Sequence, residues 1–190
     1  MDPNNTRPLL ILDLDETLIH ASENGIGRSP DFRACGYQVF RRPGLQEFLL
    51  AVAELFELAV WSSASEDYVQ IMTNTIRPDS VNWHFVWGRN RCTRRYDPER
   101  MTQFYLKNLK KLKLRGYDLT RILVVDDSWK KHTKNYGNAI YVNSFEGDPN
   151  DNELQLLLVY LRSIVNVENY RRLEKRRWRQ VASDLLQEGS

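Results

Sequence analysis

The chain has 190 residues, a formal net charge of +2, and 42% hydrophobic against 27% charged residues. This length accommodates one domain with a sizeable core, and the composition is that of an ordinary soluble globular protein. No stretch approaches the roughly 20 apolar residues of a membrane span, and the start MDPNNTRP does not resemble a signal peptide. Two cysteines, Cys35 and Cys92, are too few for a disulfide scaffold or a cysteine-based zinc site. We therefore expect a soluble intracellular protein, cytoplasmic or nuclear, that has no membrane partner.

Four short apolar runs rich in branched residues predict β-strands. They are Leu9–Leu12, Leu58–Trp61, Ile122–Val125 and Ala139–Val142. Their continuous apolar character indicates strands that are buried on both faces, as in a parallel sheet covered by helices.

Helical spacing of apolar residues predicts three helices in the segments that connect the runs. One opens at Pro43-Gly44 and continues to about Leu55, one begins at the acidic sequence 65–67 and ends before Pro78, and one covers about 151–165. Strands that alternate with helices predict an α/β fold with a doubly wound, mainly parallel sheet.

Two segments interrupt this alternation. Residues 21–42 contain several Gly and Pro residues and predict a loop followed by a short strand, Tyr37–Phe40. In residues 79–105 the alternation of Trp83, Phe85 and Trp87 predicts an antiparallel ribbon, a small β insertion after the second main strand. The insertion could be a cap packed on the sheet or a binding element.

Basic residues are concentrated between Arg89 and Arg115, where ten Lys and Arg stand against two acids, a local charge of +8 in a chain of +2. Such a segment can attract phosphates, although a solvated basic face is the commoner explanation. The tail, residues 166–190, is a second basic stretch and predicts a helix that packs Tyr170, Leu173 and Trp178 on the core, with a nucleic-acid or partner contact as the alternative.

Polar side chains follow the first three predicted strands. They are Asp13, Asp15, Thr17, Ser62, Ser63, Asp126 and Asp127. Because ligands of open α/β sheets bind beyond the carboxyl ends of the strands, we expect these residues in one cleft. Crowded carboxylates need a countercharge, and oxygen donors without a nearby His or Cys favour Mg²⁺. The histidines, His20, His84 and His132, lack metal-ligand spacing, so we expect them at the surface or in local hydrogen bonds.

This set of residues suits phosphoryl transfer. One carboxylate near Mg²⁺ can attack phosphorus, and a second, two residues away, can protonate the leaving group and then activate water. Ser62 and a lysine of the basic stretch could contact the phosphoryl oxygens.

The stretch DLDETL, residues 13–18, resembles the DxDx[TV] signature of the haloacid dehalogenase superfamily. Longer stretches are similar to the FCP/SCP-like phosphatases of the RNA polymerase II C-terminal domain and their NLI-interacting-factor-like relatives. These stretches are LDLDETLIHAS (12–22), FRRPGLQEFL (40–49), WSSASEDY (61–68), FYLKNL (104–109) and ILVVDDS (122–128). The resemblance covers about 9–165, which we take as the phosphatase domain, between a tail of residues 1–8 and the basic segment 166–190.

The resemblance implies a role for each matching residue. Asp13 matches the nucleophile, and Asp15 the general acid/base whose backbone carbonyl helps to bind the metal. Asp126 and Asp127 match the remaining acidic motif, with Asp127 as the direct Mg²⁺ ligand and Asp126 orienting the lysine. Thr17 matches the residue that stabilises the loop after the first strand. Ser62 matches one phosphate-binding position, with Ser63 as a neighbouring alternative. Lys107 matches the other phosphate-binding position, with Lys110, Lys111 and Lys113 as rivals. Arg89 matches a substrate-binding arginine of the insertion.

We therefore expect a Mg²⁺-dependent phosphatase that forms an aspartyl-phosphate and acts on phosphoserine or phosphothreonine in a protein or peptide. The basic segment keeps nucleic-acid phosphate ends or small phosphomonoesters as an alternative substrate class. A non-catalytic binding or scaffold domain is the rival from another class, and the intact set of aspartates argues against it.

Overall fold

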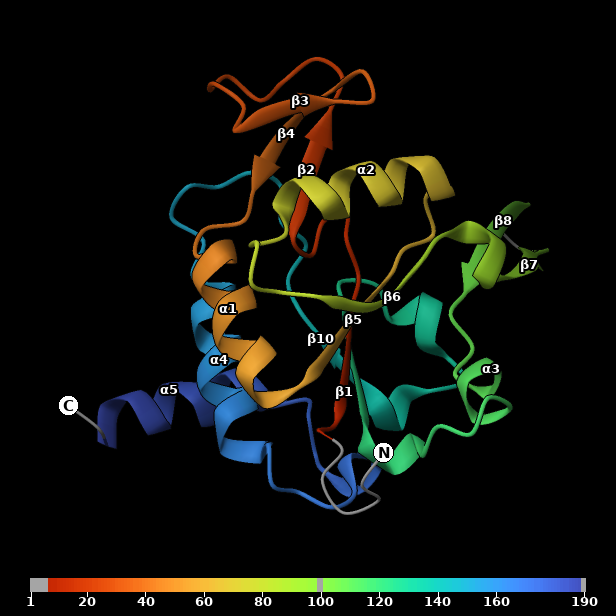
Figure 1. Cartoon of the computed structure of the whole chain (residues 1–190), viewed down its shortest axis with the longest axis vertical. Helices are drawn as coiled ribbons and strands as arrows, with labels where there is room; N and C mark the ends of the chain where they lie inside the picture. Colours follow the sequence, from red (N-terminus) through yellow and green to blue (C-terminus); the bar gives the residue numbers. More distant parts are fainter. Residues whose placement is uncertain (1–6, 99–100, 189–190) are drawn as a thin grey trace.

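A five-stranded parallel sheet forms the centre of the computed structural model, which describes residues 7–98 and 101–188 (Figure 1). Residues 1–6 of the expected N-terminal tail, 99–100 of the basic segment and 189–190 lie outside the described residues. In spatial order the strands are β10 (Ala139–Tyr141), β9 (Ile122–Asp126), β1 (Leu9–Leu12), β5 (Glu57–Trp61) and β6 (Trp83–Trp87). Four of them correspond to the four apolar runs, so the predicted parallel sheet is confirmed.

β1 lies in the middle of the sheet and is buried on both faces. Leu10 and Leu12 belong to one hydrophobic cluster, whereas Leu9 and Ile11 belong to a second cluster on the opposite face. All four side chains are at most 5% exposed. Burial on both faces explains why this strand is a continuous apolar run and not an alternating one.

Helices cover the two faces of the sheet unequally. The larger cluster includes residues of α1 (Leu45–Leu55), α2 (Glu66–Ile76), α4 (Glu153–Ile164) and α5 (Trp178–Glu188), and the smaller one includes Leu112 of α3 (Lys110–Lys113). The three predicted central helices are confirmed with ends that differ by a few residues. Among the described residues, no helix combines the length and the apolar character needed to cross a bilayer.

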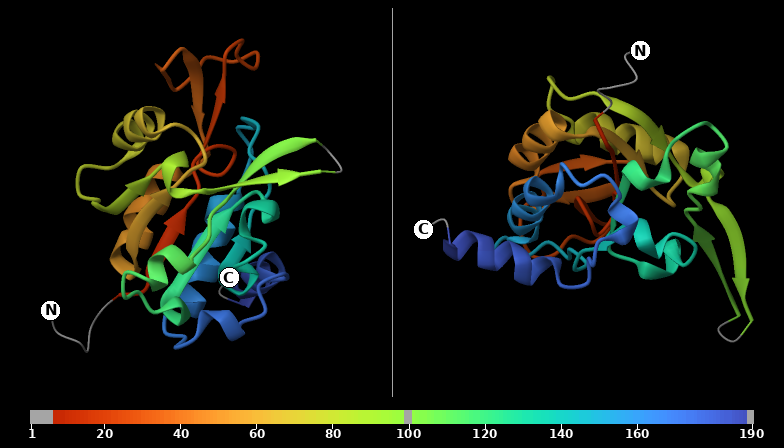
Figure 2. Two further views of the ribbon diagram at one scale, coloured as in Figure 1. Left: turned by 90° about the vertical axis from the view of Figure 1, so that its right-hand side faces the viewer. Right: turned by 90° about the horizontal axis from the view of Figure 1, so that it is seen from below.

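The aromatic alternation of Trp83, Phe85 and Trp87 marks a strand, but the prediction of an antiparallel ribbon there is wrong. This segment is β6, which pairs in parallel with β5 at the edge of the main sheet, where Trp87 packs edge to face on Trp61. Alternation reports two differently exposed faces and not the direction of the neighbouring strand. The antiparallel ribbon follows instead as β7 (Thr93–Asp97) and β8 (Thr102–Leu106), a hairpin that projects from the body (Figure 2).

The segment predicted as loop and one strand forms a second antiparallel sheet, β2–β4–β3, with β2 (Ile19–Ser22), β3 (Phe32–Ala34) and β4 (Tyr37–Arg41). Only β4 was expected, because β2 and β3, with four and three residues, are too short to give a clear periodic signal. In Figure 1 this small sheet lies above the carboxyl ends of the central strands. It therefore lies beside the edge of the central sheet at which the polar side chains were predicted.

The loop between β1 and β2 is anchored to distant parts of the chain. Arg42 is 1% exposed, and its guanidinium donates to both carboxylate oxygens of Asp151 at 2.8 Å and to the Thr17 carbonyl at 3.1 Å. The Phe145 amide donates to the Glu16 carbonyl at 2.8 Å. These bonds hold the polar residues that follow β1 in one conformation.

The C-terminal segment is helical only in part. The basic residues 166–177 contain one short helical turn, η5 (Tyr170–Arg172), and α5 begins at Trp178. The buried Lys175 ammonium donates to the Tyr170 and Leu173 carbonyls, which stabilises the turn between them. Tyr170 and Trp178 are buried and Leu173 packs on the same cluster, as predicted, while the Trp178 indole and Arg179 both donate to the Tyr141 carbonyl of β10.

Candidate active site

Strand register brings the predicted acidic residues to one edge of the sheet. Leu12 of β1 is level with Val60 of β5 and Val125 of β9, so the three strands end at the same edge of the sheet. Asp13 follows β1 directly, and its amide donates to the Val125 carbonyl at 2.9 Å. Asp126, the last residue of β9, is consequently the lateral neighbour of Asp13.

The Asp13 carboxylate is held between two lysines. It is 1% exposed, and its Oδ1 lies 2.7 Å from Lys107 Nζ while its Oδ2 lies 2.6 Å from Lys131 Nζ. Two ammonium groups compensate the charge that burial would otherwise make costly. The orientation of the carboxylate is fixed because each oxygen has its own cationic partner.

Asp126 anchors the inner side of this arrangement. Lys107 Nζ lies 2.5 Å from Asp126 Oδ2, which also accepts a hydrogen bond from His132 Nε2 at 2.8 Å. The Ser128 amide donates to Asp126 Oδ1 at 2.9 Å. Burial alone would raise the Asp126 pKa, but the Lys107 charge and the His132 hydrogen bond hold this pKa well below its usual range. Burial lowers the His132 pKa, and the imidazole donates through Nε2 because the carboxylate beside it can only accept.

The outer side contains Asp127 and Lys131, which are less buried. Lys131 belongs to the short helix η3 (Trp129–His132), and its Nζ lies 3.4 Å from Asp127 Oδ1. Burial raises the Asp127 pKa to about 6, although the Lys131 charge acts in the opposite direction. Burial would lower the Lys131 pKa, but the carboxylates of Asp13, Asp126 and Asp127 together raise it, so this lysine is cationic.

Asp15 points to a different set of partners. Tyr68 of α2 donates its hydroxyl to Asp15 Oδ1 at 2.5 Å, and the buried Ser62 hydroxyl lies 3.3 Å from Asp15 Oδ2. Burial raises the pKa of Asp15 more than the Tyr68 hydrogen bond lowers it, and the nearby Asp13 charge raises it further. Asp13 and Asp15 are therefore two residues apart in sequence but have different partners, ammonium groups for Asp13 and hydroxyl groups for Asp15.

Three carboxylates form a candidate metal site. One oxygen each of Asp13, Asp126 and Asp127 lie within 4.8 Å of one another. A set of carboxylate oxygens without a sulfur or nitrogen donor suits Mg²⁺, which prefers hard oxygen ligands. The residues thus fit the expected cation, whereas the Asp15 side chain is outside this cluster.

The remaining predicted residues lie around this centre without contacting the carboxylates of the metal cluster in the part of the chain that is described. Ser62 Oγ accepts from the Ala64 amide at 3.0 Å, and the buried Thr17 hydroxyl has no hydrogen-bond partner among residues 7–98 and 101–188. Arg89 Nε donates to the Ser63 carbonyl at 2.8 Å. This hydrogen bond connects Arg89 to the segment that follows β5.

Sequence reasoning missed two side chains that define the centre, Lys131 and Tyr68, and did not place His132 in the predicted site. Lys131 is four residues after Asp127, a spacing that brings side chains together on a helical turn. That signal was hidden because Lys130 and Lys134 are similar nearby lysines. His132 does make the local hydrogen bond that was expected, but it is fully buried and not at the surface.

Comparison with known sequences gives a consistent result. The sequence model of NLI interacting factor-like phosphatases matches residues 8–171. CTD small phosphatase-like protein 2 of Dictyostelium discoideum is 33% identical over 170 residues, which are 85% of this chain and 28% of that protein. Phosphatase PSR1 of Saccharomyces cerevisiae is 34% identical over 153 residues, which are 76% of this chain and 33% of that protein. The chain thus spans about a third or less of the length of these two relatives.

A solved structure of Fcp1, described as an essential RNA polymerase II CTD phosphatase, has a similar architecture. The similarity has a TM-score of 0.55 at 22% identity and covers 94% of this chain and 62% of that one. At this identity the similarity concerns the fold alone, and it agrees with the α/β fold expected from the sequence.

Proposed function

Because the chain belongs to the NLI interacting factor-like phosphatase family, we propose that it is a Mg²⁺-dependent phosphatase that forms an aspartyl-phosphate on Asp13. The proposed substrate class is phosphoserine or phosphothreonine in a protein. A protein substrate agrees with the description of Fcp1 as a phosphatase of the RNA polymerase II CTD. The observation that carries the proposal is the buried Asp13 carboxylate, which Lys107 contacts through Oδ1 and which lies within one cluster with Asp126 and Asp127.

The two aspartates have separate roles in this mechanism. Asp13 attacks phosphorus, so that a bond from its carboxylate oxygen to phosphorus forms while the bond from phosphorus to the substrate oxygen breaks. Asp15, whose pKa burial raises, holds the proton that the leaving oxygen takes up. Asp15 then accepts a proton from water as that water attacks phosphorus and releases phosphate from Asp13.

The other residues support these steps. Lys107 stabilises negative charge beside Asp13, and Ser62 and Tyr68 position the Asp15 carboxyl group through their hydroxyls. Asp13 and Asp127 would hold Mg²⁺, together with the more deeply buried Asp126 of the same cluster. When bound, Mg²⁺ neutralises charge on the transferring phosphoryl group and aligns it for in-line displacement.

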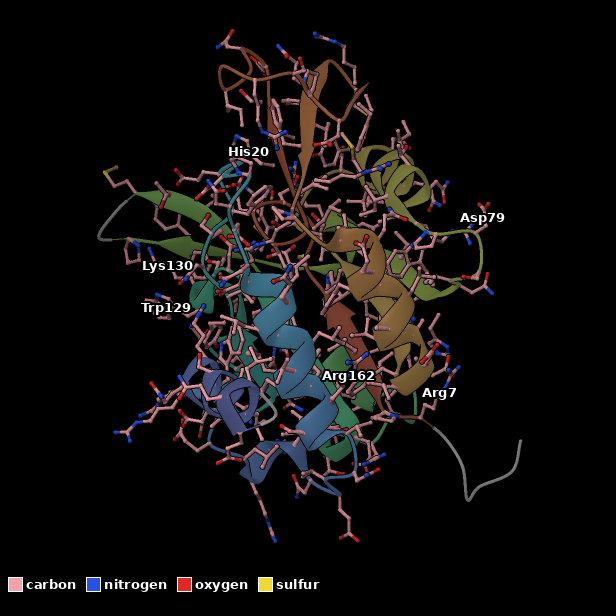
Figure 3. All side chains as sticks on the ribbon, turned by 90° about the vertical axis from the view of Figure 1, so that its left-hand side faces the viewer. Arg7, His20, Asp79, Trp129, Lys130 and Arg162 are labelled. Carbon is pink, nitrogen blue, oxygen red and sulfur yellow. The ribbon has the colours of Figure 1, made fainter. Side chains whose placement is uncertain are left out.

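Hydrolysis of an aryl phosphate tests the nucleophile. We expect wild type to turn over the substrate in the presence of Mg²⁺ and Asp13→Asn to lose activity by about 10⁴-fold or more, because the attacking carboxylate is gone. Asp79→Asn is the matched control, since Asp79 is exposed and lies on the opposite side of the molecule from Trp129 and Lys130 (Figure 3). Equal turnover by Asp13→Asn and wild type would refute the assignment, and a folded but inactive wild type would support a scaffold.

A substrate panel tests the proposed class. Phosphopeptides containing phosphoserine or phosphothreonine should have a higher kcat/KM than phosphorylated oligonucleotides. The exposed Arg94 and Arg95 on the hairpin keep the nucleic-acid alternative in the panel. Preference for oligonucleotides together with a steep loss of binding at high salt would favour that alternative.

A further inference from the structure

The Lys131 ammonium lies where a cation would contact the three clustered carboxylates. Its Nζ is 2.6 Å from Asp13 Oδ2, 3.4 Å from Asp126 Oδ1 and 3.4 Å from Asp127 Oδ1. These three residues are the same set that forms the candidate metal site. A lysine and a divalent cation cannot both occupy one position between these oxygens, since they would meet in van der Waals contact and repel each other.

The second lysine of the centre uses other oxygens. Lys107 Nζ contacts Asp13 Oδ1 and Asp126 Oδ2, so the two ammonium groups divide the carboxylate oxygens between them. Lys107 can therefore remain in place while Lys131 leaves. The division separates a permanent countercharge from an exchangeable one.

The burial of the two lysines also indicates that Lys107 is the permanent countercharge and Lys131 the exchangeable one. The Lys107 side chain is 0% exposed, whereas the Lys131 side chain is 22% exposed. The Lys131 backbone is held by its carbonyl, which accepts from the Lys107 amide at 2.9 Å, but its partly exposed side chain belongs to a short helix at the surface, whose Trp129 is 60% exposed. Movement of four methylene groups is enough to bring the ammonium into water.

We infer that Lys131 is a built-in competitor of the divalent cation, and that its ammonium must leave the carboxylate oxygens for Mg²⁺ to bind. Lys131 thus lowers the affinity of the site for metal and sets the concentration at which the site fills. This inference rests on the proposed Mg²⁺ requirement of the phosphatase.

Metal binding by the full chain tests the inference without any turnover. Isothermal titration with Mg²⁺ and with Mn²⁺ measures the metal affinity of chelator-treated wild type and of Lys131→Met, an unbranched variant that lacks the terminal ammonium and its charge. We expect the metal dissociation constant to fall by tenfold or more in Lys131→Met. Lys131→Gln provides a second neutral variant in case the first fails to fold, as circular dichroism would reveal.

Lys130→Met is the matched control, because Lys130 is an exposed neighbour in the same short helix and lies at the surface beside Trp129 (Figure 3). It changes the net charge by the same amount but removes none of the three contacts, so its dissociation constant should stay within about twofold of wild type. The added substitution Asp127→Ala should abolish the gain in Lys131→Met, which would place the cation at the acidic cluster.

Unchanged or weaker metal binding in both neutral variants would overturn the inference, since Lys131 would then coexist with the cation or assist it. The absence of binding at millimolar metal in all variants would overturn the inference together with the metal requirement. Tighter binding in Lys131→Met with no phosphatase activity in wild type would refute the proposed function and leave the competition standing.

Discussion

The two sides of the Asp13 carboxylate are built differently. On the inner side, Lys107, Asp126 and His132 have fully buried side chains, and Asp126 contacts Lys107 at 2.5 Å and His132 at 2.8 Å. On the outer side, Lys131 and Asp127 are 22% and 18% exposed and lie 3.4 Å apart. The inner side can hold the Asp13 carboxylate in position without reorganisation during the reaction. The outer side can exchange a proton or a cation with the solvent.

Removal of the inner lysine should have the largest effect. Lys107→Met leaves Asp126 and Asp13 buried with one fewer countercharge, and the cost of breaking such a buried pair is about 3–5 kcal/mol. Chemical denaturation should therefore show a large loss of the free energy of unfolding, together with loss of aryl phosphatase activity. Lys110→Met, at an exposed position three residues away, should change stability by about 0.5 kcal/mol or less. Similar stabilities of the two variants would contradict the view that the inner side is a buried ion-pair centre.

Asp127 tests the outer side through the pH dependence of stability. Its pKa of about 6 in the folded protein exceeds the ordinary value, so the folded state binds this proton more tightly than the unfolded state does. The stability that this proton contributes is present at pH 4 and is lost as the pH rises to about 6. Asp127→Asn removes this dependence, and its free energy of unfolding relative to wild type should increase by about 2 kcal/mol between pH 4 and pH 8.

The measurement is urea unfolding in the presence of a chelator at both pH values. Asp79→Asn, at an exposed site, should show a constant difference from wild type across the same range. A constant difference for Asp127→Asn as well would mean that the outer carboxylate titrates normally.

Tyr68→Phe should have the smallest effect of these substitutions, a change in the pKa of Asp15. The Tyr68 hydroxyl lowers the Asp15 pKa, so its removal raises that pKa further. Because leaving-group protonation needs the protonated form of Asp15, the alkaline limb of kcat/KM for a phosphopeptide should move upward by about one pH unit. Tyr37→Phe is the control, since the Tyr37 ring packs against Tyr68 at 5.9 Å. A downward shift, or equal shifts in both variants, would contradict this role of Tyr68.

The sequence predicted the framework of the site because its signals are local. A continuous apolar run followed by Asp13 or Asp126 reports a buried strand and its carboxyl end, whatever the rest of the fold is. The strand partner of Trp83–Trp87 could not be predicted in the same way, because one strand does not encode the direction of its neighbour. Short strands such as β2 carry too few side chains to produce a periodic signal.

Lys131 shows a second limit of sequence reasoning. Lys130, Lys131 and Lys134 are chemically identical, and only the path of the chain after β9 decides which of them reaches Asp13. Lys107 was assigned from the resemblance and not from its surroundings, for the same reason. The types of residue in the site were therefore predictable, whereas the particular cation on the outer side depended on tertiary geometry.

The contacts of the C-terminal segment with β10 have a consequence for solubility. β10 is an edge strand of the central sheet, and an exposed edge is a template on which strands of other molecules can add. The Trp178 indole and the Arg179 guanidinium occupy the outward carbonyl of Tyr141, which removes one acceptor that an incoming strand would need. α5 thus protects the sheet against edge-to-edge aggregation in addition to extending its core.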